Sequence, residues 1–395
     1  MSGVPPMLYP VLGALFAGLA IGLPVTWFLV RAGHKVGALD SVGADGHDKE
    51  LRPIPNIGGV GIFHAIALPM LIGILGIWLI DAETWSSWLP AIEPHLARIK
   101  ETTPTAVAML ACMTALHIMG LVDDRRGLGP GVKFIVQFGV AAVMVIWFDV
   151  RLLTVLDNYL PGVPGVPGSV GSIIVTMLWI VTITNAINFL DNMDGLAAGV
   201  ATIAGFFFMI ATILNHQWFI AGTLALMVGG LCGFLVFNFP PAKIFMGDGG
   251  SLVIGFLLAV LTARTTFYDP TPDFALGGAW YGVFMPLVVL AIPLYDFLTV
   301  TVIRLKQGRS PLVGDQQHFS HRLVQRGMSK RGAVIIIWGF TAMTGIGGIA
   351  LGSLAPWQAA LVGLQTLLIL MVLIMLELAS RNVPGRIAER NNVEE

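Results

Sequence analysis

Long runs of apolar residues, separated by short polar segments, are the main pattern along the chain. A helix needs ~20 apolar residues to cross the hydrocarbon core of a bilayer, and runs of this length differ from the short alternating strands of a membrane β-barrel. The pattern therefore predicts an all-α fold, a polytopic membrane helical bundle of about 11 transmembrane helices. The predicted spans are 7–30, 54–80, 104–122, 131–148, 170–189, 196–214, 218–237, 250–267, 279–303, 332–352 and 356–377.

The composition agrees with a membrane protein and restricts what it can bind. Hydrophobic residues make up 56% of the 395 residues and charged residues 11%, against ~25% in ordinary soluble domains. The mean hydropathy is +0.82, which implies more apolar surface than a water-soluble core can bury. The formal net charge of −1 excludes a global positive field that would attract nucleic acid. We expect one transmembrane domain over 1–380, embedded in the lipid bilayer, and a polar cytoplasmic tail over 381–395.

Lys and Arg are distributed unevenly between the two sets of loops. The loops on one side, together with the C-terminal tail, contain 18 of the 22 basic residues, and the other side contains Arg98, Lys100, Arg151 and Arg264. By the positive-inside rule the first side is cytoplasmic, which places the N-terminus outside and the C-terminus in the cytoplasm. Four polar clusters fall at cytoplasmic ends of predicted helices: the pair at 123–124, the series 185–194, the stretch 238–248, and the histidines at 318 and 321.

The third predicted span ends in two adjacent carboxylates, Asp123 and Asp124. At a membrane boundary they repel each other unless a cation or a proton compensates. A divalent ion or a substrate proton would do so. The alternative is that both carboxylates pair with Arg125 and Arg126 in a solvated loop. Lys133, at the start of the next span, is a candidate for holding a phosphate.

The fifth predicted span ends in polar residues at every third position, Asn185, Asn188, Asp191 and Asp194. Neighbouring pairs at this spacing share a helical face, and each Asp buried in lipid would cost ~2.5–3.5 kcal/mol. We therefore expect the row to face a water-filled cleft lined by protein. An interhelical hydrogen-bond ladder is the alternative, and it suits the asparagines better than the aspartates.

A glycine-rich segment, Asn238 to Ser251, leads into the eighth span and places Asp248 between glycines. Small neighbours let a bulky ligand approach the backbone, and free amides at the start of the helix favour an anion there. Mg²⁺ takes one or two protein carboxylates and completes its shell with water and phosphate oxygens, so Asp248 is the predicted metal ligand. Phe245 is a candidate for stacking on a flat ring. A plain N-cap turn is the alternative for this segment.

The loop between the ninth and tenth spans, 304–331, combines basic residues with His318 and His321. Without a cysteine or an intervening glutamate the two histidines are a weak zinc signal. Recognition of a phosphate or sugar fits the neighbouring cations better, and binding of lipid headgroups is the alternative. Together, the four clusters describe a metal-assisted site for a diphosphate at the membrane surface, with a membrane-borne second substrate.

Five motifs, in order from Arg52 to Leu323, resemble the polyprenyl-phosphate N-acetylhexosamine-1-phosphate transferases. They are Arg52-Pro-Ile-Pro-Asn-Ile-Gly-Gly, Leu121-Val-Asp-Asp with Lys133, Asn185-Ala-Ile-Asn-Phe-Leu-Asp-Asn-Met-Asp-Gly-Leu-Ala, Pro241-Ala-Lys-Ile-Phe-Met-Gly-Asp-Gly-Gly-Ser-Leu, and Gly308-Arg-Ser-Pro with the loop of His318 and His321. The last motif looks like the branch that uses UDP-N-acetylglucosamine, rather than the branch that uses UDP-N-acetylmuramoyl-pentapeptide.

The resemblance implies a reaction and a location. A polyprenyl phosphate, expected to be undecaprenyl phosphate, would attack the β-phosphate of a UDP-sugar and give undecaprenyl-diphosphate-sugar and UMP, the first step of a cell-envelope glycan. The resemblance also implies Mg²⁺ on Asp248, with Mn²⁺ as an alternative ion. The domain 1–380 would be catalytic and would lie in the bacterial inner (plasma) membrane with its active site on the cytoplasmic face. A homodimer is an option for its assembly.

The resemblance further implies roles for individual residues. Asp123 would orient or deprotonate the lipid phosphate with Asp124 beside it, and His318 is the third catalytic candidate. A phosphate with a second pKa of ~6 is already largely ionised, so positioning and charge neutralisation are favoured over a strict base. The expected substrate-binding residues are Arg52, Lys133, Asn185, Asn188, Asp191, Asp194, Asn238, Phe245, Arg309 and His321. Of these, Phe245, Asp191 and Asp194 would line a uridine pocket.

Two positions depart from the pattern of the family. Ser320 stands where the related branch often has a histidine, which leaves the sugar specificity open, and Asn192 stands where a glycine is common. Three rival functions remain. A muramoyl-pentapeptide transferase would prefer the larger UDP-sugar, a transporter would carry its carboxylates near the bilayer midplane rather than at one face, and a silent scaffold would release no UMP.

Overall fold

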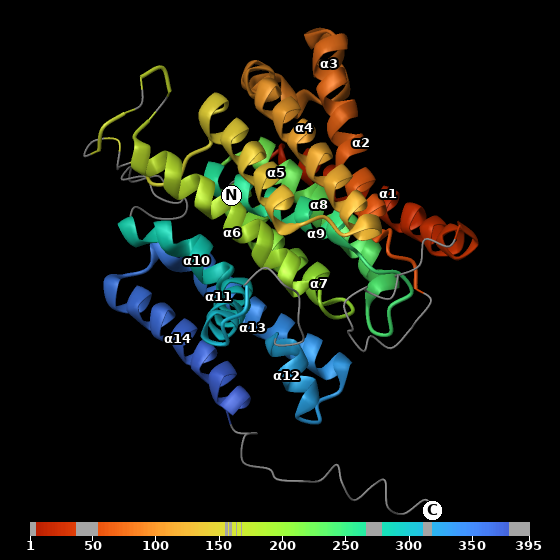
Figure 1. Ribbon diagram of the computed structural model, residues 1–395. Helices are drawn as coiled ribbons and strands as arrows, with labels where there is room; N and C mark the ends of the chain where they lie inside the picture. Colours follow the sequence, from red (N-terminus) through yellow and green to blue (C-terminus); the bar gives the residue numbers. More distant parts are fainter. Residues whose placement is uncertain are drawn as a thin grey trace, which may run out of the picture.

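The computed structural model shows a bundle of helices (Figure 1). It describes residues 5–36, 54–154, 157, 160–162, 164–166, 168–265, 279–310 and 318–378. Within these ranges no β-strand occurs, and an isolated bridge joins Gly162 to Ser169. The predicted site residue Arg52 and the predicted tail 381–395 lie outside the described residues.

Nine helices in the described part of the chain are long and apolar enough to cross a membrane. This confirms the predicted all-α membrane fold, whereas the count of 11 spans and their orientation stay predictions. The nine helices are α1 (Leu8–Val36), α2 (Gly58–Leu79), α4 (Leu96–Arg126), α5 (Pro130–Ala142) with its continuation to Trp147, α6 (Val170–Leu190), α7 (Leu196–Leu214), α8 (Trp218–Asn238), α13 (Lys330–Ala350) and α14 (Pro356–Leu378).

The predicted span 279–303 is not one straight helix. The segment Trp280–Val289, which ends with α10 (Met285–Val289), meets α11 (Ala291–Lys306) at an angle of 65°. Pro293 lacks the amide hydrogen that a continuous helix would bond to the Val289 carbonyl. The chain therefore bends just before this proline.

The eighth predicted span forms α9 (Asp248–Arg264), a helix of 17 residues at the centre of the bundle. Every residue from Gly249 to Ala263 is buried, and α9 packs against α2, α4, α6, α7 and α8 (Figure 1). A helix that is apolar all round belongs in the interior of a protein. Because α9 begins at Asp248, the neighbouring helices place their ends around that residue.

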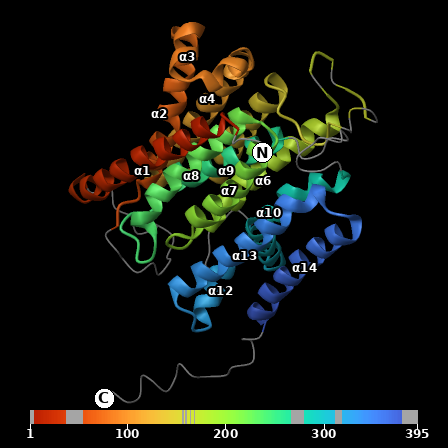
Figure 2. The same cartoon turned by 180° about the vertical axis from the view of Figure 1, so that it is seen from behind.

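Glycines let α1 lie directly on α8, on the face of the bundle seen in Figure 2. Gly18 and Gly22 of α1 lie against Gly230 of α8, and a Cβ added at Gly229 would collide with the backbone of Leu15 and Leu19. Membrane helices associate through such close backbone contacts, because burial of apolar side chains away from lipid gives little net free energy.

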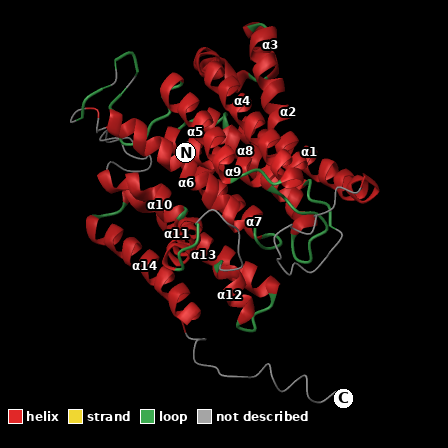
Figure 3. Ribbon diagram, in the orientation of Figure 1, coloured by secondary structure: helices red, strands yellow, loops and turns green. Residues whose placement is uncertain are grey.

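Short helices lie at both ends of the bundle (Figure 3). Between α2 and α4 the chain forms α3 (Ala82–Trp88) and the 3-10 helix η1 (Pro90–His95), neither of which the sequence predicted. Asp81 starts α3 by accepting a hydrogen bond of 2.8 Å from the Thr84 amide. At the other end, α12 (Phe319–Gln325) precedes α13.

Candidate active site

Three aspartates lie together where α4 ends and α9 begins. Asp123 and Asp124 belong to the last turn of α4, and Asp248 is the first residue of α9. Lys133, in the first turn of α5, places its Nζ 2.8 Å from Asp248 Oδ2 and also contacts Asp123 Oδ2. We call five residues the carboxylate cluster: Asp123, Asp124, Lys133, Asp248 and, from α6, Asn188. Lys133, rather than the exposed arginines that follow Asp124, therefore compensates Asp123 and Asp248.

Asp124 binds the start of α9. Its Oδ1 accepts a hydrogen bond of 3.0 Å from the Asp248 amide, and its Oδ2 accepts one of 3.3 Å from the Gly249 amide. The next two amides, of Gly250 and Ser251, bond to a carbonyl one turn earlier. The prediction that free amides here would bind an anion of the ligand is wrong, because the protein's own carboxylate satisfies this helix end and its dipole. These four amides are therefore not available to a substrate phosphate.

Gly247 makes the contact between Asp124 and α9 possible. Its φ of +68° lies in the region that favours glycine, and an added Cβ would lie 2.5 Å from Asp124 Oδ2 and 2.8 Å from Asn56 Oδ1. Asn56 also donates a long hydrogen bond of 3.4 Å to Asp124 Oδ1. Any side chain at position 247 would displace the carboxylate.

The segment before Asp248 is also held from two other helices. The amides of Gly58 and Gly59, at the start of α2, donate hydrogen bonds of 2.9 Å each to the two carbonyls that precede Gly247. His117 of α4 approaches the Gly249 carbonyl with Nδ1 at 2.7 Å. The position of Asp248 is thus fixed by backbone contacts to α2 and α4 on both sides of it.

The polar row at the end of α6 was predicted either to face a water-filled cleft or to form an interhelical hydrogen-bond ladder. Its asparagines make different contacts. Asn188 Nδ2 donates to Asp248 Oδ1 at 2.8 Å and to Ser251 Oγ at 2.9 Å, so it joins the carboxylate cluster. Asn185, one turn earlier, donates to Gln137 Oε1 of α5 at 2.5 Å and to its own helix. Asn185 therefore forms the interhelical ladder, and its contact with a substrate stays a prediction.

Asp194 and Asn238 hold the turn between α6 and α7 against the loop that leads to α9. Asp194 Oδ2 accepts a hydrogen bond of 2.9 Å from the Ala242 amide. Asn238 is 3% exposed, accepts from the Gly195 amide at 2.9 Å and donates to the Ile244 carbonyl at 2.8 Å. Both ends of the Asn238 side chain are thus bonded to backbone, which shapes this loop.

Three further candidates lie around these elements. Asp191 is the C-terminal cap residue of α6, Phe245 is half-buried in the segment held by α2, and Arg309 is exposed just after α11. Their predicted contacts with a nucleotide or a phosphate stay predictions.

His318 lies in a second polar cluster together with Asp296, which was not predicted from the sequence. It donates from Nδ1 to Oδ2 of Asp296 in α11 at 2.8 Å, and the Phe319 amide donates to Asp296 Oδ1 at 3.0 Å. Asp296 has no exposed surface. A buried carboxylate on Nδ1 fixes the orientation of the imidazole and leaves Nε2 for other contacts. The signal was available, because a lone acid inside an apolar span is a functional candidate by itself.

Phe189 joins the two clusters at the end of α6. Its ring centroid lies 5.8 Å from the ring of His318 and 5.2 Å from the ring of Phe297, and the guanidinium carbon of Arg304 lies 5.2 Å from it. Arg304 is 2% exposed, so a buried cation lies beside the same aromatic ring as His318. Because Asn188 and Phe189 are consecutive, the carboxylate cluster and His318 meet at one helix end.

The first turn of α12 contacts the same end of α6. Ser320 Oγ donates to Asn192 Oδ1 at 2.6 Å, and the ring of His321 hydrogen-bonds the backbone of Asn192. Burial lowers the pKa of His321, and the nearby His318 lowers it further. The protein surroundings of His321 therefore favour its uncharged imidazole.

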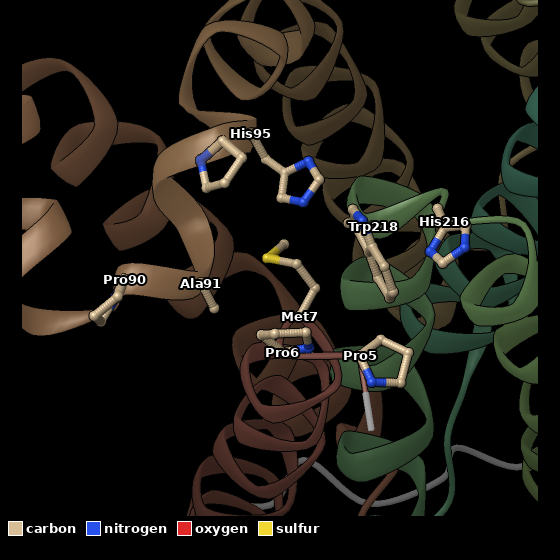
Figure 4. A pocket seen from close by; sticks show the side chains of 9 residues that line it. Pro5, Pro6, Met7, Pro90, Ala91, His95, His216 and Trp218 are labelled. Carbon is tan, nitrogen blue, oxygen red and sulfur yellow. The ribbon is translucent and has the colours of Figure 1, made fainter. Parts of the chain in front are cut away.

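A cavity of about 480 Å³ lies at the opposite end of the bundle (Figure 4). The start of α1, η1 and the connection from α7 to α8 surround it, which shows that segments predicted to be outside gather at one end. Its lining lacks carboxylates and is mainly apolar, so it does not suit a diphosphate. The lining residues are Pro5, Pro6, Met7, Pro90, Ala91, Pro94, His95, His216 and Trp218.

The donor chemistry of the carboxylate cluster suits Mg²⁺. Oxygens of Asp123 and Asp248 face one cationic nitrogen, that of Lys133, so the fold brings two carboxylates to a single cation position. Across the residues that the structure describes, no group of three or more His, Cys, Asp or Glu side chains is arranged to hold a metal. Two carboxylates without a closed cage match an ion that takes its remaining ligands from water and phosphate.

Comparisons with known proteins cover most of the chain. The sequence model of glycosyl transferase family 4 matches residues 106–266, which include the whole carboxylate cluster. The chain is 29% identical, over 95% of its length and 93% of the relative, to a probable undecaprenyl-phosphate N-acetylglucosaminyl 1-phosphate transferase of Bacillus subtilis. It is 32% identical, over 86% of its length and 82% of the relative, to the decaprenyl-phosphate N-acetylglucosaminephosphotransferase of Mycolicibacterium smegmatis. It is 27% identical, over 79% of its length and 76% of the relative, to the undecaprenyl-phosphate alpha-N-acetylglucosaminyl 1-phosphate transferase of Escherichia coli.

Proposed function

We propose an activity for this chain from the premise that it belongs to glycosyl transferase family 4, among the polyprenyl-phosphate N-acetylhexosamine-1-phosphate transferases. The chain transfers N-acetylglucosamine-1-phosphate from UDP-N-acetylglucosamine to undecaprenyl phosphate, giving undecaprenyl-diphosphate-N-acetylglucosamine and UMP. The names of the relatives support the sugar and the polyprenyl phosphate, and they include both undecaprenyl and decaprenyl acceptors.

The observation that carries the proposal is the carboxylate cluster, in which helix ends from α4, α5, α6 and α9 converge on Asp248. Transfer of a phosphoryl group between two anionic substrates depends on positioning and on compensation of charge. The cluster supplies both, because its side chains are fixed by hydrogen bonds and two of its carboxylates contact the ammonium of Lys133.

In this mechanism an oxygen of the lipid phosphate attacks the β-phosphorus of the UDP-sugar, and the bond from that phosphorus to the bridging oxygen breaks to release UMP. The lipid phosphate is largely ionised at neutral pH, so Asp123 orients it and a strict base is not required. Lys133 brings a positive charge to the reacting phosphates. Mg²⁺, held by Asp248 with Asp123 as the neighbouring carboxylate, would supply further positive charge on the diphosphate oxygens. His318, oriented by Asp296 through Nδ1, keeps Nε2 for a contact with the substrate.

The proposal places the site at the cytoplasmic face of the bacterial inner (plasma) membrane. The support is the basic-residue bias, because the loops at the end of the bundle that carries the carboxylate cluster hold most of the Lys and Arg. The names of the relatives disfavour the muramoyl-pentapeptide donor. Carboxylates gathered at one end of the bundle disfavour an ion path near the bilayer midplane.

The test is a transfer assay with the purified full-length protein in detergent. Radiolabelled UDP-N-acetylglucosamine, undecaprenyl phosphate and Mg²⁺ should give a labelled lipid product and one UMP for each lipid formed. Replacing the donor by UDP-N-acetylmuramoyl-pentapeptide should give much slower release. No UMP from either donor in the presence of the acceptor would contradict the proposal.

Asp248→Asn tests the metal assignment. The amide keeps the shape of the side chain and its bond from Asn188 but loses the charge, so we expect at least ~100-fold lower Mg²⁺-dependent transfer, with the protein still folded by circular dichroism. Glu83→Gln is the matched control, because it removes an exposed carboxylate in α3, at the other end of the molecule. Wild-type activity in the Asp248 variant would remove Asp248 as the metal ligand.

A further inference from the structure

We infer that Asn192 is a positioning residue, which fixes α12, and with it His318, against the end of α6. The inference rests on the proposed function, because His318 is a catalytic candidate only for that reaction. Neither the sequence motifs nor the names of the relatives assign a role to Asn192.

Asn192 uses both ends of its side chain and its backbone in this contact. Its Oδ1 accepts the hydrogen bond of 2.6 Å from Ser320 Oγ, and its Nδ2 donates to the Phe189 carbonyl at 2.6 Å. Its backbone bonds the ring of His321. The side chain is thus held to α6 at one end and to α12 at the other.

The partner hydroxyl is in the interior of the protein. Ser320 has no exposed surface, so its hydroxyl cannot exchange Asn192 for water when that bond is lost. A buried polar group left without its partner is costly, and α12 would have to shift to satisfy it.

The position of α12 must come from such contacts. A helix of seven residues, Phe319–Gln325, is too short to be stable by itself. Its first turn is held by Asp296, which bonds residues 318 and 319, and by Asn192, which bonds residues 320 and 321. Asp296 orients the His318 ring. Asn192 sets where the first turn of α12 lies relative to α6.

The end of α6 then acts as a common support for the site. Within five residues, Asn188 bonds Asp248, Phe189 contacts His318, and Asn192 bonds Ser320. Loosening Asn192 would change the distance from His318 to the carboxylate cluster without touching either. A misplacement of ~1 Å at a reacting centre can lower a rate ~100-fold.

A double-mutant cycle in the full-length protein tests this role. Asn192→Ala and Ser320→Ala should each lower kcat by ~10- to 100-fold, the range found for groups that orient a functional side chain. KM for UDP-N-acetylglucosamine and for undecaprenyl phosphate should stay close to the wild-type values. The double variant should be no worse than the more impaired single variant, because both changes remove the same contact.

Ser329→Ala is the matched control. It removes another hydroxyl from the same region, and that hydroxyl caps α13 by accepting from the Gly332 amide at 3.1 Å. We expect a lower thermal midpoint for this variant and an unchanged kcat. The control separates a loss of stability from a loss of positioning.

The outcomes are distinguishable. Additive effects of the two substitutions on kcat would overturn the inference. A raised KM for the UDP-sugar with normal kcat would also overturn it, because Asn192 would then contact the nucleotide itself. A wild-type protein without transfer activity would instead overturn the proposed function, and with it the role given to Asn192.

Discussion

Lys133 is the residue on which the charge balance of the carboxylate cluster depends. Its ammonium contacts both Asp123 and Asp248, so it lies where positive charge is needed by two carboxylates and by any incoming phosphate. A hydrogen bond to a charged group contributes ~1.5–3 kcal/mol. Lys133→Ala should therefore raise KM for the UDP-sugar, for the lipid phosphate, or for both by ~10- to 100-fold.

The measurement is initial-rate kinetics with each substrate varied in turn. Lys100→Ala is the control, because Lys100 is an exposed lysine at the opposite end of the molecule, and it should leave both constants unchanged. If KM for both substrates were unaltered in the Lys133 variant, this lysine would not belong to the binding site.

Asp296 shows that a residue outside the recognised motifs can orient one inside them. Asp296→Asn leaves one acceptor oxygen for two donors, His318 Nδ1–H and the Phe319 amide, so one buried donor loses its partner. We expect ~1–3 kcal/mol lower stability and a kcat lowered by ~10- to 100-fold. Thermal unfolding and transfer kinetics measure the two effects separately.

Thr299→Val serves as the control for this prediction. In the described part of the chain, the Thr299 hydroxyl donates within α11, to the Tyr295 carbonyl at 2.8 Å and the Asp296 carbonyl at 3.1 Å. The Thr299→Val substitution changes the polarity of α11 without removing a contact to α12. Equal losses of kcat in the two variants would argue against an orienting role for Asp296.

At the scale of elements, the contact of α1 with α8 depends on glycine. Gly229→Val would place side-chain atoms on the α1 backbone near Leu15, and such overpacking typically costs ~1–3 kcal/mol. We expect a lower thermal midpoint and less folded protein on extraction. Gly222→Val is the control on the same helix, because a Cβ there meets no atom within 4 Å.

Thermal melts by circular dichroism in one detergent compare these two variants. Equal midpoints would mean that the glycines do not set the distance between the helices. The close approach matters for the site, because the loop after α8 leads to Asp248 at the start of α9.

The elements were predictable to different degrees. Apolar runs of about 20 residues placed the long helices, because their length is set by the bilayer. The bend between α10 and α11 follows from Pro293 but was not predicted, because a proline within an apolar run does not by itself say whether the helix continues. The short helix α3 was also missed, because its polarity resembles that of a loop.

At the scale of the whole molecule, α4 offers a test of orientation. Lys100 and Arg126 are exposed near its two ends, roughly 39 Å apart at 1.5 Å per residue. In a background with Cys112→Ala and Cys232→Ala, we expect a membrane-impermeant maleimide to label Lys100→Cys, but not Arg126→Cys, in spheroplasts. Inverted vesicles should give the opposite result. Labelling of both from the same side would contradict the predicted topology.

The sequence by itself determined the class of the protein, the separation of its polar clusters from its apolar spans, and the residue types at the candidate site. These follow from local properties, because hydropathy, charge bias and motif spacing act along the chain. Only the tertiary structure decided which groups meet. Asp124 occupies the amides at the start of α9, Asn185 pairs with Gln137, and Asp296 holds His318. Each of these contacts joins residues from different helices, and no pattern along one segment specifies which helix ends lie side by side.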